Sequence, residues 1–381
     1  MKKRLLIVTE ALEMNGVLRS LLDFMEAIDK NRYDIELFCF DSFKPDYVTL
    51  PSYVRLLKED PWCYMARAPL SRVLTWGARH GTILPVITRL FCSAFQGKFR
   101  RFAKRDLIKQ ASFRQDHYDV AIAYSMGMTW WYLAEKISAT TKIAWLHTDY
   151  RAAAQNPAWR FYAKFLDRIT ALVCVSNGIR NCLSAEYPGL KAKVWCVHSV
   201  VDSAAILAKG AATFEHARKR KFRIVTVGRF SPQKNQVLIP QIAEEMRSQG
   251  LDDFEWIMAG PGADGCRVDD PNLFYLDAIS NPIPLIKSAD VYVQPSTYEG
   301  WGLTVTEAMV LGRYVVTSDI VSFVEQIPSA NYGQAVPLEA KAFALAIVDA
   351  LRSGRYGQVP PYVCPYTAEL NRTEFEKVIV G

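Results

Sequence analysis

Residues 224–235 read Ile-Val-Thr-Val-Gly-Arg-Phe-Ser-Pro-Gln-Lys-Asn, an apolar run that passes into a polar loop with glycine and proline. A helix-like stretch, 237–246, follows the loop. An apolar run, a turn and a helix in this order are typical of a buried parallel strand and its return helix. The loop places two cations, Arg229 and Lys234, just after the strand. A guanidinium and an ammonium group together can match the charge of a diphosphate.

A second segment of the same design lies further along the chain. Residues 299–307 read Glu-Gly-Trp-Gly-Leu-Thr-Val-Thr-Glu and follow the strand-like residues 291–295. Gly300 and Gly302 stand just ahead of an amphipathic helix, where bare backbone N–H groups and the positive helix end can meet an anion. Glu299 and Glu307 offer two carboxylates that can bind hydroxyl groups. The two segments together predict a nucleotide-sugar site.

Strand-like and helix-like runs alternate through nearly the whole chain, which predicts an α/β protein with parallel sheets covered by helices on both faces. Most of the strand-like runs lack polar alternation, as strands buried on both faces do. In the first half these runs are 5–9, 35–40, 120–124, 143–146, 172–175 and 194–197, and in the second half 223–227, 254–259, 273–276, 291–294 and 314–317.

The chain length predicts two domains. With 381 residues, half of them hydrophobic, the chain can fill two cores and is long for one. The alternating pattern weakens over residues 204–221, an alanine-rich and then basic stretch that we interpret as the connection between the domains. We therefore expect an N-terminal domain over 1–202 and a C-terminal domain over 203–359, with residues 360–381 packing back on the first.

No apolar run approaches the roughly 18 residues of a membrane-spanning helix, so none is expected. The amino terminus, Met-Lys-Lys-Arg and then a short apolar run before Glu10, resembles a first buried strand more than a signal peptide. A cytoplasmic protein is expected. The eight cysteines are scattered without a Cys-x-x-Cys pair, and we interpret them as reduced core residues.

The net charge of +7 is moderate, but the basic residues are unevenly placed. The densest cluster follows a stretch rich in tryptophan, arginine and aliphatic residues, and its cations are Lys98, Arg100, Arg101, Lys104 and Arg105. Interleaved basic and aromatic residues suit an anionic membrane surface, which is our interpretation. A solvated helix face is the alternative. Nucleic acid is not expected, because no motif for it accompanies the charge.

The order of these motifs carries a resemblance to a known family. Gly-Arg-x-x-x-x-Lys at 228–234, followed by Ser-x-x-Glu-Gly-x-Gly-Leu-x-x-x-Glu at 296–307, resembles family 4 of the retaining glycosyltransferases. Supporting pieces stand in the same order as in that family: 15–16, 143–147, 175–177, 259–262, 288–291 and 306–309. The resemblance spans most of the chain and implies the GT-B architecture, two Rossmann-like domains that face a central cleft.

The resemblance also implies roles for individual residues. Arg229 and Lys234 would hold the donor diphosphate and stabilise charge on the leaving group. Glu299 would reach the transferred sugar, and Glu307 would accept hydrogen bonds from the ribose hydroxyls. The remaining residues expected at the donor are Gly260, Gly300, Gly302, Leu303 and Thr304, the last four placed to present backbone N–H groups to the phosphates.

Three residues of the first half are expected at the cleft. His147 follows a buried-looking strand, and the resemblance places it near the transferred sugar or acceptor, where it could assist proton movement or hold a hydroxyl group. A lone histidine is otherwise more often a hydrogen-bonded structural residue. Asn15 and Gly16 form a turn in which glycine allows close approach of a ligand, near donor or acceptor.

The resulting hypothesis is a retaining transfer of a hexose-type sugar from a UDP- or GDP-type donor to a glycan, in particular a lipid-linked glycan of surface polysaccharide synthesis at the inner membrane face. No Asp-x-Asp occurs, so neither a metal nor another cofactor is expected. A paired-carboxylate glycosidase has no diphosphate to hold and would not need the cationic loop. A nucleotide-sugar epimerase of the same architecture and a non-catalytic glycan-binding partner remain the alternatives.

Overall fold

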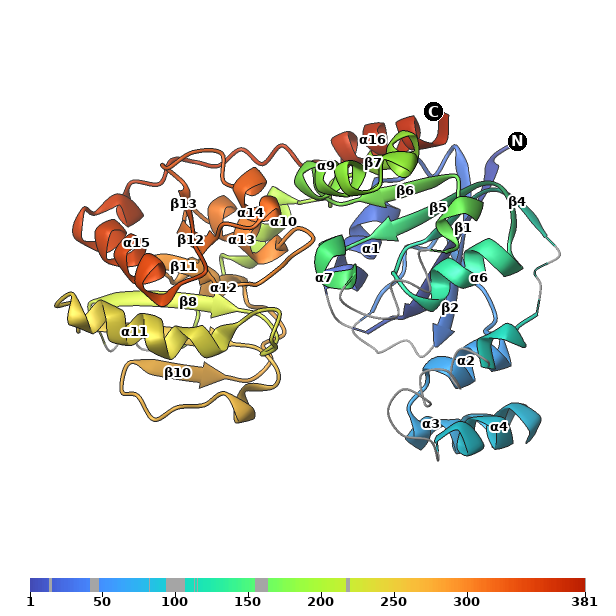
Figure 1. Ribbon diagram of the computed structural model, residues 1–381, viewed down its shortest axis with the longest axis horizontal. Coiled ribbons are helices and arrows are strands. Elements are labelled where there is room, and N and C mark those ends of the chain that lie inside the picture. Colours follow the sequence, from blue (N-terminus) through green and yellow to red (C-terminus); the bar gives the residue numbers. More distant parts are fainter. Residues whose placement is uncertain are drawn as a thin grey trace. The chain divides into compact units, whose positions relative to one another are not determined.

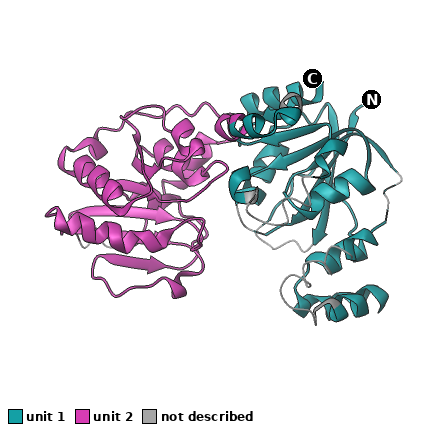
Figure 2. Cartoon of the chain, viewed as in Figure 1, with its two compact units in different colours: residues 1–175, 182–199, 368–381 teal, residues 176–181, 200–367 magenta. Residues whose placement is uncertain are grey.

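Two parallel β-sheets organise the chain, each inside a unit of its own (Figure 2). The computed structural model describes residues 1–13, 16–41, 48–81, 83–93, 107–112, 114, 116–154, 164–216 and 220–380. Unit 1 comprises residues 1–175, 182–199 and 368–381, and unit 2 comprises 176–181 and 200–367. The chain therefore passes into unit 2 and returns to unit 1 for its last residues.

The sheet of unit 1 has seven parallel strands in the order β3-β2-β1-β4-β5-β6-β7 (Figure 1). From the central strand β1 the chain builds outward to β3, and it then adds β4 to β7 on the other side of β1. Leu5 pairs with Ile35 on one side and with Val120 on the other, and all three are buried. The strands are β1 (Lys3–Ala11), β2 (Tyr33–Asp41), β3 (Val54–Leu56), β4 (His117–Ala123), β5 (Ser138–Leu146), β6 (Ala171–Cys174) and β7 (Val194–Cys196).

Helices cover this sheet and return the chain between its strands. The last helix, α16, packs against α1: Phe24 and Phe375 meet edge to face at 5.1 Å, and Arg372 Nε donates to the carbonyl of Ala27 at 2.8 Å. The helices are α1 (Gly16–Ala27), α2 (Pro61–Arg67), α3 (Leu70–His80), α4 (Ile83–Ser93), α6 (Met128–Lys136), α7 (Tyr150–Ala154), α9 (Asn177–Glu186, which begins in unit 2) and α16 (Ala368–Val380).

The sheet of unit 2 has six parallel strands in the order β10-β9-β8-β11-β12-β13 (Figure 1). Here too the chain builds outward from a central strand, β8, and then continues on its other side. The strands are β8 (Phe222–Val227), β9 (Phe254–Ala259), β10 (Leu273–Leu276), β11 (Val291–Gln294), β12 (Tyr314–Ser318) and β13 (Gly333–Val336).

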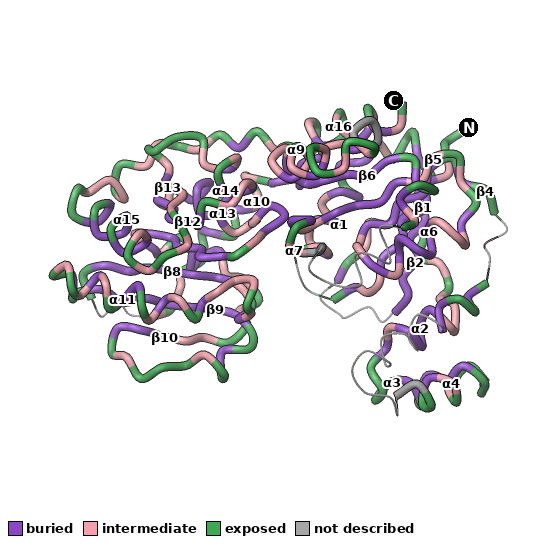
Figure 3. Tube along the Cα trace, viewed as in Figure 1, coloured by how far each residue is buried: buried purple, intermediate pink, exposed green. Residues whose placement is uncertain are grey.

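Alternate strand residues of unit 2 enter two cores, one on each face of the sheet. Ile224 packs in the core that holds α11 and α15, whereas Val225 packs in the core that holds α10, α12, α13 and α14. Figure 3 shows burial along the strands, which is complete in β8, β9, β11 and β12 and partial in the edge strands β10 and β13. The helices are α10 (Ser203–Lys209), α11 (Ile239–Ser248), α12 (Ile283–Lys287), α13 (Leu303–Val310), α14 (Val321–Gln326) and α15 (Ala340–Arg352).

The α/β architecture with two Rossmann-like sheets is confirmed, and one local interpretation is wrong. Residues 204–221 are not simply a connection, because α10 occupies 203–209 and packs into a core of unit 2 through Ile206. The units divide at 199/200 and at 367/368, where the sequence analysis placed divisions after 202 and 359. Within the described ranges, no helix combines the length and the apolarity needed to cross a bilayer.

Candidate donor site and its comparison with known proteins

The two motif-bearing loops of unit 2 meet at the carboxyl ends of adjacent strands. β8 and β11 are neighbours in the sheet, and β8 leads into the loop with Arg229 and Lys234, while β11 leads into the loop with Glu299. The backbone N–H of Thr297 donates to the carbonyl of Gln233 at 2.8 Å, which ties one loop to the other. The strand order reverses between β8 and β11, and such a switch point is where open parallel sheets bind ligands.

Lys234 and Glu299 form an ion pair at this switch point. Lys234 Nζ lies 2.5 Å from Glu299 Oε1, and the two side chains are 20% and 8% exposed. The same carboxylate accepts hydrogen bonds from Ser296 Oγ at 2.8 Å and from Gln233 Nε2 at 3.2 Å. Glu299 is thereby held in one orientation, with an ammonium group beside it.

Arg229 presents its guanidinium to solvent from a fixed backbone. Gln236 Nε2 donates to the carbonyls of Gly228 and Arg229, each at 3.0 Å. Among the residues that the structure describes, none forms an ion pair with the exposed Arg229 side chain. Gly260 follows β9 and lies so close that a Cβ on it would be 2.1 Å from the carbonyl oxygen of Gly228. Glycine at 260 thus allows the β8 and β9 ends to pack together, leaving Arg229 as an available cation.

The predicted glycine-flanked helix start is also present. Gly302 is the N-cap of α13 in the left-handed conformation, with φ +55°, and as a glycine it offers no capping side chain. Leu303 and Thr304 open the helix, so their N–H groups lie among the first four that an α-helix leaves without an intrahelical partner. Glu307, one turn further along, is 2% exposed.

Gly300 and Trp301, in the loop that leads into α13, are both buried. Trp301 is 4% exposed and packs edge to face on Tyr366 at 4.6 Å, and its carbonyl accepts a hydrogen bond from Gln326 at 2.9 Å. These contacts give Trp301 a packing role.

Unit 1 has its own switch point, between β1 and β4. Gly16 begins α1 shortly after β1, while Asn15 lies outside the described residues. His147 directly follows β5, and its ring lies 4.7 Å from that of Tyr124 and 6.2 Å from that of Trp145. The predicted residues therefore fall into two groups, one at the carboxyl edge of each sheet.

His147 is an electrically neutral side chain at ordinary pH. Burial lowers the pKa of His147 to about 3, against which a hydrogen bond to the backbone of Tyr124 acts weakly in the other direction. Its Nε2 is buried, and no described residue gives it a hydrogen-bond partner. The imidazole is thus suited to hydrogen bonding with a hydroxyl group and poorly suited to carrying a positive charge.

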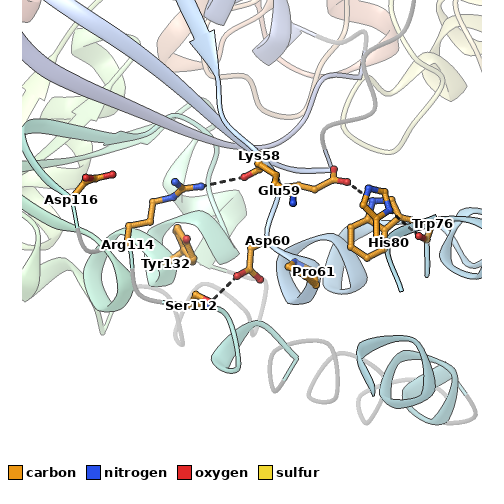
Figure 4. Close-up of a pocket in the computed structure, with 10 residues that line it drawn as sticks. All are labelled: Lys58, Glu59, Asp60, Pro61, Trp76, His80, Ser112, Arg114, Asp116 and Tyr132. Atoms are coloured by element: carbon orange, nitrogen blue, oxygen red, sulfur yellow. Dashed lines mark hydrogen bonds between the residues drawn. The ribbon is translucent and has the colours of Figure 1, made fainter. Parts of the chain in front are cut away.

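A cavity of about 480 Å³ lies elsewhere in unit 1 and is lined by none of the predicted site residues (Figure 4). Asp60 in its lining has a structural role, because it accepts hydrogen bonds from the backbone N–H groups of Trp62, Cys63 and Ser112. Within the described residues, no group of three or more His, Cys, Asp or Glu side chains is placed to hold a metal ion.

The sequence analysis gave no role to three residues that build the site. Ser296 and Gln233 hold the Glu299 carboxylate, and Gln236 holds the backbone at Arg229. Ser296 stood inside the Ser-x-x-Glu motif, so its position was visible in the sequence. Its function was not, because it depends on which oxygen of Glu299 faces the serine.

Two Rossmann-like units, with a cation-bearing site at the switch point of the second, have the fold of GT-B glycosyltransferases. Residues 221–353 match the family model described as "Glycosyl transferases group 1". The match spans less than half of the chain, and the matched segment contains Arg229, Lys234, Glu299 and Glu307.

Similar proteins point to the same class. The O-antigen biosynthesis glycosyltransferase WclY of Escherichia coli is 40% identical over 53 residues, which cover 14% of this chain and 15% of WclY. EpsF of Bacillus subtilis (strain 168), which carries a provisional glycosyltransferase name, is 22% identical over 195 residues, 44% of this chain and 50% of EpsF. The matches span no more than half of these relatives.

A solved structure of TarM from S. aureus, determined on a point mutant, covers 100% of both chains with a TM-score of 0.66 and 11% identity. This likeness concerns the fold.

Proposed function

We propose that the protein is a retaining glycosyltransferase that moves a hexose-type sugar from a nucleoside diphosphate sugar to a glycan acceptor. The observation that carries the proposal is the arrangement of Arg229, Lys234 and Glu299 at the switch point of unit 2, inside the matched group 1 domain. The TarM structure was solved with UDP, fondaparinux and alpha-GlcNAc-glycerol, which supports a donor of UDP type. A GDP-type donor is the alternative within the same proposal.

In this proposal the two cations serve the departing diphosphate. As the bond from sugar to phosphate breaks, negative charge builds on the leaving oxygen, and preorganised donors nearby lower the barrier. Arg229 is exposed and can fold onto the phosphates, and the ion pair with Glu299 already fixes the position of the Lys234 ammonium group. The charge is then matched by side chains, without a metal ion. The free N–H groups at the start of α13 add donors of the same sign.

The carboxylates and His147 would handle hydroxyl groups. Glu299 can exchange a hydrogen bond from Ser296 or Gln233 for one from the sugar, and Glu307 would accept from the ribose. His147 would hold a hydroxyl group of the sugar or acceptor through its Nε2. With a pKa of about 3 it is a weak base, so holding is favoured over proton removal.

The proposed acceptor is a lipid-linked glycan of surface polysaccharide synthesis, and the proposed location is the inner face of the cytoplasmic membrane. The name of WclY, an O-antigen biosynthesis glycosyltransferase, supports this acceptor class. The basic cluster Lys98, Arg100, Arg101, Lys104 and Arg105 supports contact with anionic lipid, although these residues lie outside the described part of the chain.

Thermal unfolding with a panel of nucleotides and nucleotide sugars tests the donor site. A ligand at about 100 times its Kd stabilises the protein by about 2.7 kcal/mol. The stabilisation should be lost in Arg229→Ala and Glu307→Gln and kept in Lys341→Ala, an exposed lysine on α15. The absence of stabilisation by every nucleotide would refute the proposal. A nucleotide sugar that is converted without acceptor would identify an epimerase instead.

A further inference from the structure

One segment of unit 1 has no negative side chain. Residues 61–105 contain no Asp or Glu, although the whole chain has 39, and they carry nine Lys and Arg. Helices α2, α3 and α4 lie inside this segment, and residues 94–105, with five of the nine cations, lie outside the described part. A long run that excludes one sign of charge favours an anionic contact surface.

Helix α4 exposes its apolar face to solvent and buries its cation, the reverse of what is usual for a surface helix. Ile83, Leu84 and Ile87 recur at helical spacing, and they are 73%, 65% and 57% exposed. Arg89 of the same helix is 1% exposed. A helix at the surface of a domain normally places its apolar stripe inward and its cations outward. On the adjacent helix α3, Leu74 is 58% exposed as well.

Side-chain contacts fix helix α3 to the rest of unit 1. Trp76 of α3 is stacked between Tyr64 and His80, at 4.6 and 4.2 Å between ring centroids. Its Nε1 donates to Glu59, and Figure 4 shows Trp76 with His80 and Glu59. Arg72 of α3 makes two hydrogen bonds to Asp41 at the end of β2, at 3.0 and 2.7 Å. Helix α3 is thereby fixed on unit 1, and α4 packs against α3 and α2.

We propose that Leu74, Ile83, Leu84 and Ile87, here called the α3–α4 surface, insert into the interfacial layer of a bilayer that contains anionic lipids. An 11-residue helix is too short to span the bilayer, and an exposed aliphatic face within a chain segment that has nine cations and no acid suits an interfacial position. The acid-free composition selects the occupant, because anionic headgroups over an apolar layer complement both features. The inference rests on the proposed membrane association and names the residues that enter the lipid.

Vesicle co-sedimentation of the full-length protein tests the inference. We expect binding to phosphatidylcholine vesicles that contain phosphatidylglycerol, and weaker binding to phosphatidylcholine alone. The triple variant I83S/L84S/I87S should bind the anionic vesicles at least about tenfold more weakly, which is about 1.4 kcal/mol. The matched control L207S/V324S/L345S changes three unit 2 residues that are 55%, 55% and 51% exposed, and it should bind as the parent does.

Unchanged vesicle binding by the triple variant would overturn the inference. So would a parent protein that is dimeric in solution and becomes monomeric in the triple variant, because the surface would then be a self-association interface. If the triple variant does not fold, the single substitution Ile83→Glu replaces it at the most exposed position of α4. Nucleotide-induced stabilisation is measured on the same preparations, so that failure of the donor site is seen separately from failure of lipid binding.

Discussion

Replacing Gly302 by alanine tests whether the start of α13 requires glycine for two separate reasons. Gly302 has φ +55°, and a Cβ built on it would lie 2.4 Å from Cε1 of Phe323 and 3.2 Å from its Cζ. Real Cβ atoms do not approach a carbon atom so closely, and Phe323 is fully buried in α14. An alanine therefore strains the backbone and also collides with a packed ring.

The two costs can be estimated separately. A residue with a Cβ in the left-handed region loses about 1–2 kcal/mol. Forcing an extra carbon atom into a packed core costs about 1–3 kcal/mol. Gly302→Ala should thus lower the free energy of unfolding by about 2–5 kcal/mol. Gly312, at the other end of α13, has φ +71° with nothing within 4 Å of an added Cβ, so Gly312→Ala should show the backbone cost alone.

Urea unfolding of the two variants, with a double-mutant cycle, measures the difference. Phe323→Leu removes the ring atoms that the new methyl group would strike, and it costs stability by itself because the ring is buried. In G302A/F323L we expect a favourable coupling energy of about 1–3 kcal/mol, the steric part of the cost. Equal losses in G302A and G312A, together with a coupling energy near zero, would refute the reasoning.

Three further substitutions probe the charged and titrating groups. Lys234→Met leaves the nearly buried Glu299 carboxylate without its cation, and the unfolding free energy should fall by about 1–3 kcal/mol, with a smaller loss when Glu299→Gln is added. Arg223→Met removes the ion pair between Arg223 and Glu255, which is 0% exposed, and chemical unfolding should show a loss of about 3–5 kcal/mol. For His147 the pKa falls from 6.5 to about 3 on folding, so between these pH values the unfolded chain binds more protons than the folded one. The free energy of unfolding should therefore drop as pH falls below about 6.5, by up to about 1.4 kcal/mol per pH unit. His147→Gln should flatten that part of the stability profile between pH 7 and pH 5.

The strands that the sequence predicted best are those whose runs are bounded on both sides by polar or turn residues. β9, β10 and β11 begin and end where the pattern placed them, since each run is bounded by polar or turn residues. β13 was missed because its residues, Gly-Gln-Ala-Val at 333–336, contain no apolar run and lie at an edge of the sheet. β3, with three residues at the edge of the other sheet, was missed for the same reason.

Helix α10 was missed for a different reason. Its alanine-rich composition suggested a connection between domains, yet Asp202 caps the helix by accepting from the N–H of Ala205 at 2.9 Å. An aspartate followed by good helix formers is a helix-start signal, and Ile206 supplies the buried contact. The alanine-rich composition and the capping aspartate both favour a helix here, so the sequence analysis misinterpreted the composition.

The donor-site residues were predicted individually, but their pairing was not. Lys234 and Glu299 are separated by 65 residues, and nothing in either motif indicates that their side chains touch. Their contact follows from the strand order, because β8 and β11 become neighbours only when the chain crosses to the second half of the sheet. Strand order depends on long-range pairing, which a local pattern does not record.

The switch points of the two units differ in their functional groups, although each has a carboxylate paired with a cation. In unit 2 the switch point carries Arg229 and Lys234, which suits an anion. In unit 1, Glu10 at the end of β1 accepts from the N–H of Met128 at 3.3 Å and pairs with Arg67 at 3.6 Å, and His147 beyond β5 is neutral. A neutral imidazole and a carboxylate suit hydroxyl groups better than phosphates. This difference supports the assignment of the diphosphate to unit 2 and of the hydroxyl-bearing acceptor to unit 1, since each switch point has the charge that its proposed substrate requires.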